Sequence, residues 1–174
     1  MPLRVIKDED EIAIMRQAGA ITEAAYQATL GKLRHGMTNL DLISEVNYQL
    51  KKHGGLTHSF VTSFYNMGKN FPFAFHNSHE VLQIPLEPPV SISFDFGAVY
   101  EGYCYDYGRS VFFGEPDAEY RKVYDLVINA QAAGIAALYA GNSCEQADAA
   151  ARAVIVDGGY GTAFRHRLGH AIGM

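Results

Sequence analysis

The sequence predicts an α+β fold in which an antiparallel sheet is flanked by pairs of helices. Apolar residues recur every three or four positions near the start of the chain and again beyond residue 116, as they do on the buried face of a helix. Between these regions, residues 60–114 are rich in aromatic and β-branched side chains, carry Gly and Pro punctuation, and show no helical period. Helix pair, strands and helix pair therefore follow one another, which suggests an internal duplication.

The first helix pair has clear start and stop signals. Asp8 followed by Glu11 predicts a capping box, and the apolar stripe that follows predicts a helix over about residues 9–33. Thr38 with Asp41 predicts the start of a second helix, which a pair of glycines should end.

The second helix pair is predicted in the same way. Pro116 and Asp117 open a long helical stretch that should end near Gly141. Ser143 with Gln146 predicts another capping box, and the helix that it begins should stop at the next glycine pair.

Composition argues against two classes of partner. The net charge of -5 and the scattered Lys and Arg residues provide no basic surface for nucleic acid. Nowhere do about 18 apolar residues run together, so we expect no membrane span. The only cysteines, Cys104 and Cys144, form no CxxC motif, which favours a reducing compartment and a cytoplasmic protein.

Two aspartates stand on either side of a predicted hairpin turn. If the turn is centred between Tyr100 and Glu101, Asp95 and Asp106 lie directly opposite one another, with Cβ atoms about 4.5–5.5 Å apart. Like charges in such a place repel unless a proton or a cation lies between them. Carboxylates that can bridge two metal ions are what a two-metal centre requires, so the sequence predicts a metal site here.

A structural explanation for the same aspartates stays open. Asp95 could cap a turn with Gly97, and Asp106 could pair with Arg109 in an exposed hairpin. The apolar neighbours of Asp95 argue for burial, and a buried carboxylate without a partner is costly. Arg109 could serve one carboxylate but hardly both, which favours the metal interpretation.

Two histidines occur close to the end of the chain. His166 and His170 bracket three residues that include a glycine, and they could share one helical face or one bent loop. Neutral imidazole is a common ligand of divalent transition metals. A pair of this kind is also frequent on ordinary surfaces, so by itself it predicts little.

Together these residues resemble the signature of the M24 metallopeptidases, and the opening IKDEDEIAIMRQAG resembles the start of their catalytic domain. The matching pieces are Asp95-Phe96-Gly97, Gly102-Tyr103, Asp106, Arg109-Ser110 and His166-Arg167-Leu168-Gly169-His170-Ala171-Ile172-Gly173. The resemblance implies the pita-bread fold and two divalent metal ions, which could be Mn, Co, Zn or Fe. It also implies that Asp95 binds one metal, Asp106 bridges both and His170 binds the other.

The resemblance further implies a peptidase with a peptide as its partner. His166 resembles the substrate-binding histidine of the Xaa-Pro peptidases, so we expect cleavage next to proline at the N-terminal end of peptides. A second substrate-facing histidine should come from the loop that holds His76 and His79, and spacing does not choose between them. A methionine aminopeptidase, a non-catalytic pita-bread binding module and a creatinase-like amidinohydrolase stay open as alternatives, as does a homodimer.

Members of this family complete the metal centre with two glutamates that follow the histidine. The sequence ends at Met174, before such residues would occur. We therefore expect residues 1–115 to form the first half of the catalytic domain and residues 116–174 to begin the second. On its own, such a piece is expected to bind metal weakly and to self-associate.

Overall fold

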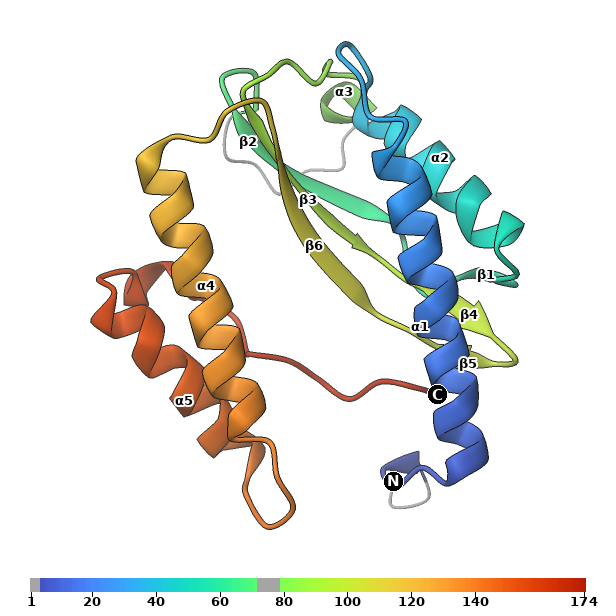
Figure 1. Ribbon diagram of the computed structural model, residues 1–174, viewed down its shortest axis with the longest axis vertical. Helices are drawn as coiled ribbons and strands as arrows, with labels where there is room; N and C mark the ends of the chain where they lie inside the picture. Colours follow the sequence, from blue (N-terminus) through green and yellow to red (C-terminus); the bar gives the residue numbers. More distant parts are fainter. Residues whose placement is uncertain (1–3, 72–78) are drawn as a thin grey trace. The chain divides into compact units, whose positions relative to one another are not determined.

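A computed structural model describes residues 4–71 and 79–174, which separate into two compact units (Figure 1). The first unit consists of the described part of residues 1–115 together with Ile172–Met174, and the second consists of residues 116–171. Each unit has its own cluster of buried apolar side chains. Whether the two units are the halves of a duplicated domain stays a prediction.

Two helices of the first unit lie side by side, α1 (Glu9–Leu30) and α2 (Asn39–Lys52). The predicted capping box of Asp8 and Glu11 is confirmed, with the Glu11 amide donating to Asp8 Oδ1 at 2.9 Å. The predicted helix start at Thr38 is also confirmed, and there Thr38 and Asp41 form a second capping box. Helix α1 ends three residues earlier than predicted, because the chain tightens into i, i+3 hydrogen bonds after Thr29.

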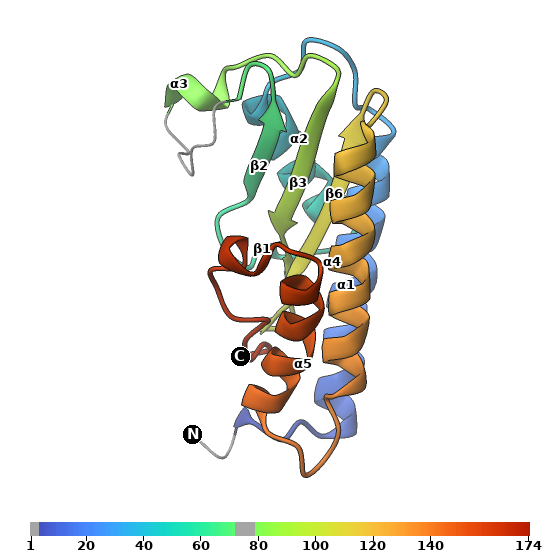
Figure 2. The same ribbon diagram turned by 90° about the vertical axis from the view of Figure 1, so that its left-hand side faces the viewer.

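Short strands fill the region between residues 57 and 113, as predicted. One antiparallel sheet has the order β2-β3-β6 and the other has the order β1-β4-β5, and Figure 2 shows β2, β3 and β6 side by side. Their bounds are β1 Thr57–His58, β2 Ser63–Gly68, β3 Val90–Phe96, β4 Ala98–Tyr100, β5 Tyr103–Cys104 and β6 Tyr107–Phe113. A short helix, α3 (His79–Leu82), precedes β3. The predicted α+β class with antiparallel strands is confirmed.

Strand β3 forms the centre of the first unit. Alternate residues of this strand, Ile92, Phe94 and Phe96, are fully buried in one cluster with side chains of α1 and α2. Tyr26 of α1 meets the Phe94 ring edge-on at 5.3 Å between centroids. Asp95, on the other side of the strand, is half-buried and belongs to the polar face.

The hairpin turn lies one residue further along than predicted. Tyr100 pairs with Tyr103, so the turn residues are Glu101 and Gly102, and the centre lies between these two. Both have positive φ, 46° at Glu101 and 84° at Gly102, as a two-residue type I′ turn requires. The glycine tolerates this conformation and decides which dipeptide makes the turn.

This shift corrects the predicted pairing of the two aspartates. Asp95 stands opposite Gly108 and not opposite Asp106. The same register continues into β4 and β5, which by counting brings Asp106 opposite Gly97. Asp106 is two residues from Gly108, so it is a diagonal neighbour of Asp95 on the same face, about 7–8 Å away. The carboxylates still share a face, but they are further apart than predicted.

The second unit is a helical hairpin of α4 (Ala118–Ala136) and α5 (Cys144–Asp157), followed by the 3-10 turn η2 (Gly161–Ala163). The predicted capping box of Ser143 and Gln146 is confirmed by its hydrogen bonds, and the predicted start of the long helix is confirmed with Asp117 as its N-cap. Among the described residues, no helix combines the length and the apolar character that crossing a membrane requires.

Helix α4 ends five residues before the predicted Gly141. The side-chain amide of Asn142 donates to the Ala137 carbonyl at 2.7 Å and so satisfies one of the last carbonyls of the helix. The buried residues of this hairpin are Ala130 and Gly134 of α4 and Ala147, Ala151 and Ile155 of α5, most of which are small.

Candidate metal and peptide site

The polar face of the β2-β3-β6 sheet carries the first candidate ligands. Asp95 and Asp106 are both half-buried on this face. Tyr65 of β2 is close to Asp95, with its hydroxyl 3.5 Å from Asp95 Oδ2. Burial and then the negative charge of Asp95 raise the pKa of Tyr65 above its ordinary value. On the same face, the hydroxyls of Ser93 and Ser110 form a hydrogen bond of 2.8 Å.

The backbone around Asp106 is held by contacts from two distant parts of the chain. Ser59, directly after β1, donates its hydroxyl to the Tyr105 carbonyl at 2.6 Å and its amide to the Gly97 carbonyl at 2.9 Å. Thr22 of α1 accepts a hydrogen bond from the Ala98 amide at 3.1 Å. These contacts hold the backbone between β3 and β4 and the backbone between β5 and β6. Asp106 lies in the second of these segments.

Replacing Ser59 with alanine should lower the free energy of unfolding by about 1–2 kcal/mol, because the half-buried Tyr105 carbonyl loses a donor. Chemical unfolding followed by circular dichroism would measure this. Ser44→Ala is the matched control, since the Ser44 hydroxyl bonds only to an exposed helix carbonyl. Equal stability of the Ser59 and Ser44 variants would contradict the role given to Ser59.

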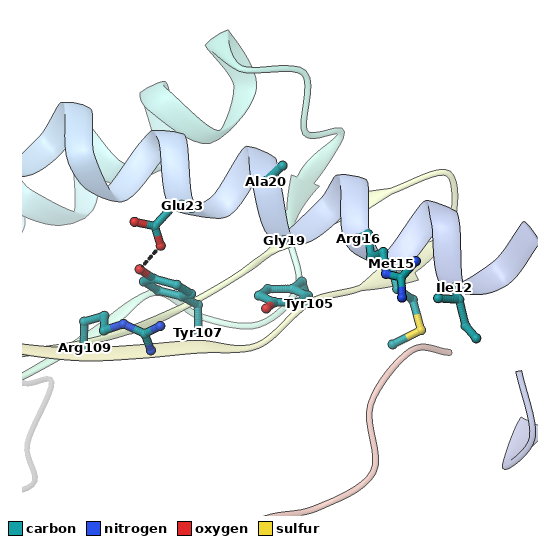
Figure 3. Close-up of a pocket in the computed structure, with 9 residues that line it drawn as sticks. All are labelled: Ile12, Met15, Arg16, Gly19, Ala20, Glu23, Tyr105, Tyr107 and Arg109. Atoms are coloured by element: carbon teal, nitrogen blue, oxygen red, sulfur yellow. Dashed lines mark hydrogen bonds between the residues drawn. The ribbon is translucent and has the colours of Figure 1, made fainter. Parts of the chain in front are cut away.

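The opposite face of β6 borders a hollow of about 450 Å³ against α1 (Figure 3). Tyr107 donates its hydroxyl to Glu23 of α1, and the Arg109 guanidinium lies over the Tyr107 ring at 4.3 Å. Burial and then the bond to Glu23 raise the pKa of Tyr107. Because Tyr107 and Arg109 alternate with Gly108 along β6, this hollow is on the other side of the sheet from Asp95.

The second group of candidate ligands belongs to the second unit. His166 and His170 are exposed on one loop after η2. Nδ1 of His166 lies 2.8 Å from the Arg167 carbonyl, and Nδ1 of His170 lies 2.9 Å from the Ala171 carbonyl. A carbonyl only accepts, so each neutral ring carries its proton on Nδ1 and keeps the lone pair on Nε2. A neutral imidazole can bind a metal through the ring nitrogen that carries no proton.

Hydrogen bonds connect the histidine loop to two side chains of α5. Asp148 accepts a hydrogen bond from the Leu168 amide at 2.7 Å, and Arg152 donates to the carbonyls of Phe164 and His166. The bond from Arg152 and then the bond from the Leu168 amide hold the pKa of Asp148 below its ordinary value.

Of the two histidines that were candidates for a substrate-facing role upstream of Asp95, the structure describes one. His76 lies outside the described residues. His79 is exposed in α3, with its ring against the side-chain amide of Gln83. The role of His79 stays a prediction.

The candidate donors therefore form two sets. Asp95 and Asp106 share one hairpin face of the first unit, and His166 and His170 share one loop of the second. Within the described part of the chain, no cluster of three or more His, Cys, Asp and Glu side chains is arranged to hold a metal. Carboxylate and imidazole donors suit Mn, Co, Fe and Zn, so the chemistry of the residues fits the predicted ions.

The profile of one family, described as metallopeptidase family M24, matches residues 13–174. The chain belongs to this family. A curated M24 relative, the Xaa-Pro dipeptidase of Lactobacillus delbrueckii subsp. lactis, is 36% identical over 173 residues, which make up 99% of the chain and 46% of that relative.

Solved structures agree with the M24 assignment. The Xaa-Pro dipeptidase from Bacillus anthracis matches 99% of this chain with a TM-score of 0.89 and 32% identity, over 47% of its own length. The X-Pro aminopeptidase from Thermotoga maritima MSB8 matches 99% of this chain with a TM-score of 0.89 and 34% identity, over 48% of its own length. The M24 chain thus spans about half the length of these relatives, and the predicted fold is confirmed.

Several residues around the M24 site were not anticipated from the sequence. Three residues from distant parts of the chain form hydrogen bonds with the hairpin, and no local sequence pattern indicates this role. They are Tyr65, Ser59 and Thr22. Asp148 and Arg152 are four residues apart on a helix, a spacing that does indicate an ion pair. Only the fold shows that this pair also contacts the histidine loop.

Proposed function

We propose that the protein is a metal-dependent exopeptidase that cleaves peptides next to proline near their N-terminal end. The main support is the pair of carboxylates on one hairpin face, Asp95 and Asp106, in a chain that belongs to family M24. The names of the relatives favour peptides that contain an Xaa-Pro bond as the substrates.

In this proposal the carboxylates and one histidine hold two divalent metal ions, which could be Mn, Co, Zn or Fe. Asp95 would hold one ion, Asp106 would be shared by both and His170 would hold the other. When bound, such ions lower the pKa of a coordinated water towards neutrality and supply the nucleophile. His166 would help to bind the substrate and to stabilise the transition state, and His76 or His79 would face the substrate.

The last residues of the chain contact the hairpin of the first unit. Gly173 belongs to this unit, and its carbonyl accepts a hydrogen bond from the Cys104 amide at 2.6 Å. Cys104 is two residues from Asp106 in the sequence, and Gly173 follows His170 by three residues.

The remaining expectations belong to the same proposal. A peptide is the expected substrate, and a homodimer is the oligomer to test. Cys104 and Cys144 are both free thiols, which suits a reducing compartment such as the cytoplasm.

Metal titration and peptide turnover would test the proposal on the full-length natural protein. We expect Mn²⁺-dependent hydrolysis of Xaa-Pro peptides, and a loss of Mn²⁺ affinity of at least about tenfold in Asp106→Ala, because losing a direct ligand should cost at least as much as losing an outer-shell partner. Asp125→Ala is the matched control, since Asp125 is an exposed aspartate of α4.

Two outcomes would contradict the proposal. Equal Mn²⁺ affinity of wild type and Asp106→Ala in calorimetry would exclude Asp106 as a ligand. Turnover of a Met-Ala peptide with no turnover of Xaa-Pro peptides would favour a methionine aminopeptidase.

A further inference from the structure

Helix α5 presents one ion pair to the loop that carries the two candidate histidines. Arg152 Nε donates to Asp148 Oδ2 at 2.9 Å, and Arg152 Nη2 lies 3.3 Å from Asp148 Oδ1. The two residues are one helical turn apart and both are only partly exposed. An exposed ion pair of this spacing stabilises a helix by only about 0.3–0.5 kcal/mol, so its other contacts are of greater interest.

Arg152 makes most of those contacts with its planar guanidinium. Nη1 donates to the Phe164 carbonyl at 2.8 Å, and Nη2 donates to the His166 carbonyl at 3.0 Å. The guanidinium also lies over the Phe164 ring, 4.4 Å from its centroid. The Phe164 ring in turn meets the His166 ring edge-on at 5.1 Å. One side chain therefore fixes the backbone before His166 and the ring that contacts the His166 imidazole.

Asp148 fixes the next part of the loop. Its Oδ1 accepts a hydrogen bond from the Leu168 amide at 2.7 Å. The Leu168 side chain then packs against Gly134 of α4, where an added Cβ would come within 2.5 Å of the leucine. The residue halfway between His166 and His170 is therefore held by its amide and by its side chain.

We propose that Asp148 and Arg152 are positioning residues that fix the loop of residues 164–170 and so orient His166 and His170. This inference rests on the proposed peptidase function for the roles of the two histidines. Neither Asp148 nor Arg152 touches the substrate in this scheme. Both act through the loop backbone, and they act as a pair because Asp148 orients the guanidinium that holds the two carbonyls.

The geometry requires arginine and not merely a positive charge. Lysine could keep the ion pair with Asp148, but an ammonium group lacks the planar fork that reaches two carbonyls and a carboxylate at once. Arg152→Lys should therefore preserve the charge and the helix but release the loop. Arg165→Lys is the matched control, because among the described residues the Arg165 side chain makes only a long hydrogen bond of 3.4 Å, to the Thr162 carbonyl.

Amide hydrogen exchange in the full-length natural protein tests the inference without any activity. We expect the Leu168 amide to exchange at least about tenfold faster in Arg152→Lys and in Asp148→Ala than in wild type or Arg165→Lys. Exchange in the middle of α4 and α5 should stay unchanged. Unchanged exchange at Leu168 in both variants would overturn the inference.

A double-mutant cycle on kcat tests the effect on the histidines. Arg152→Lys should lower kcat about tenfold with little change in KM, and it should have almost no further effect in a His166→Ala background. Additive effects of the two changes would mean that Arg152 supports the fold in general, and this would overturn the positioning role.

The two tests separate this inference from the proposed function. If His166→Ala and His170→Ala leave turnover and Mn²⁺ affinity unchanged, the peptidase roles of the histidines are wrong, and hydrogen exchange still reports whether the pair holds the loop. If those variants lose activity while Leu168 exchange is insensitive to Arg152→Lys, the function stands and the positioning role is wrong.

Discussion

Replacing Gly97 with alanine is expected to lower the free energy of unfolding by about 3 kcal/mol or more. A Cβ at this position would lie 1.7 Å from the Tyr105 carbonyl oxygen and 2.6 Å from the Ser59 hydroxyl. The first of these atoms belongs to the backbone of the facing strand, so it cannot move without opening the hairpin. Gly97 is therefore required for the close approach of two chains.

Urea unfolding of the full-length natural protein would measure this effect. Gly108→Ala is the matched control on the same hairpin, because its added Cβ would find only the Phe94 carbonyl at an ordinary 3.8 Å. We expect the Gly108 variant to stay within about 0.5 kcal/mol of wild type. Similar stabilities of the two alanine variants would show that the hairpin adjusts easily at Gly97.

The same substitution should also affect the proposed metal site. Gly97 faces Asp106 across the hairpin and follows Asp95 by two residues, so widening this point moves both carboxylates. At temperatures where the variant is still folded, we therefore expect its Mn²⁺ affinity to fall at least about tenfold. Asp95 and Asp106 would then be present but displaced.

The helix boundaries were largely predictable because their signals are local. A side chain that caps a helix bonds to an amide only three residues away, so Asp8, Thr38 and Ser143 could be identified from the sequence alone. The end of α4 was missed because Asn142 caps it from outside the apolar stripe. Helix boundaries could thus be predicted where a capping residue next to the apolar stripe marked the end of the helix.

The hairpin register was missed for a different reason. The sequence offers several dipeptides between the two strand-like runs, and moving the turn centre by one residue changes every cross-strand pair. Gly102 was the available clue, because a type I′ turn needs positive φ at both of its central residues. Asp95 and Asp106 kept a common face because their spacing has the right parity for either turn.

The supporting residues of the site could not be read from the sequence. Ser59 acts on Tyr105 from 46 positions away, and Arg152 reaches the Phe164 and His166 carbonyls from the preceding helix. Such contacts depend on how elements pack, and packing is not encoded in any short motif. The spacing of Asp148 and Arg152 indicates a pair on one helix face, but the sequence does not show that the pair contacts the histidine loop.

Truncating Phe94 to alanine should lower the free energy of unfolding by about 3–5 kcal/mol, as expected when a buried aromatic ring leaves a cavity. Phe94 is only 2% exposed and packs edge-on against Phe64 at 4.7 Å and Tyr26 at 5.3 Å. Thermal and urea unfolding would measure the loss. Phe94→Leu fills most of the volume and should cost less than about 1.5 kcal/mol.

The position of Phe94 allows a test of whether the core and the metal site are separable. Phe94 and Asp95 are adjacent on β3, but they face opposite sides of the sheet, so the alanine variant keeps both carboxylates. Under the proposed function, Mn²⁺ should raise the melting temperatures of wild type and of Phe94→Ala alike, since a ligand that binds only the folded state stabilises it by mass action. Asp106→Ala should show no such rise. If Mn²⁺ fails to stabilise Phe94→Ala where wild type responds, the strand that carries Asp95 depends on this ring for its position as well as for its stability.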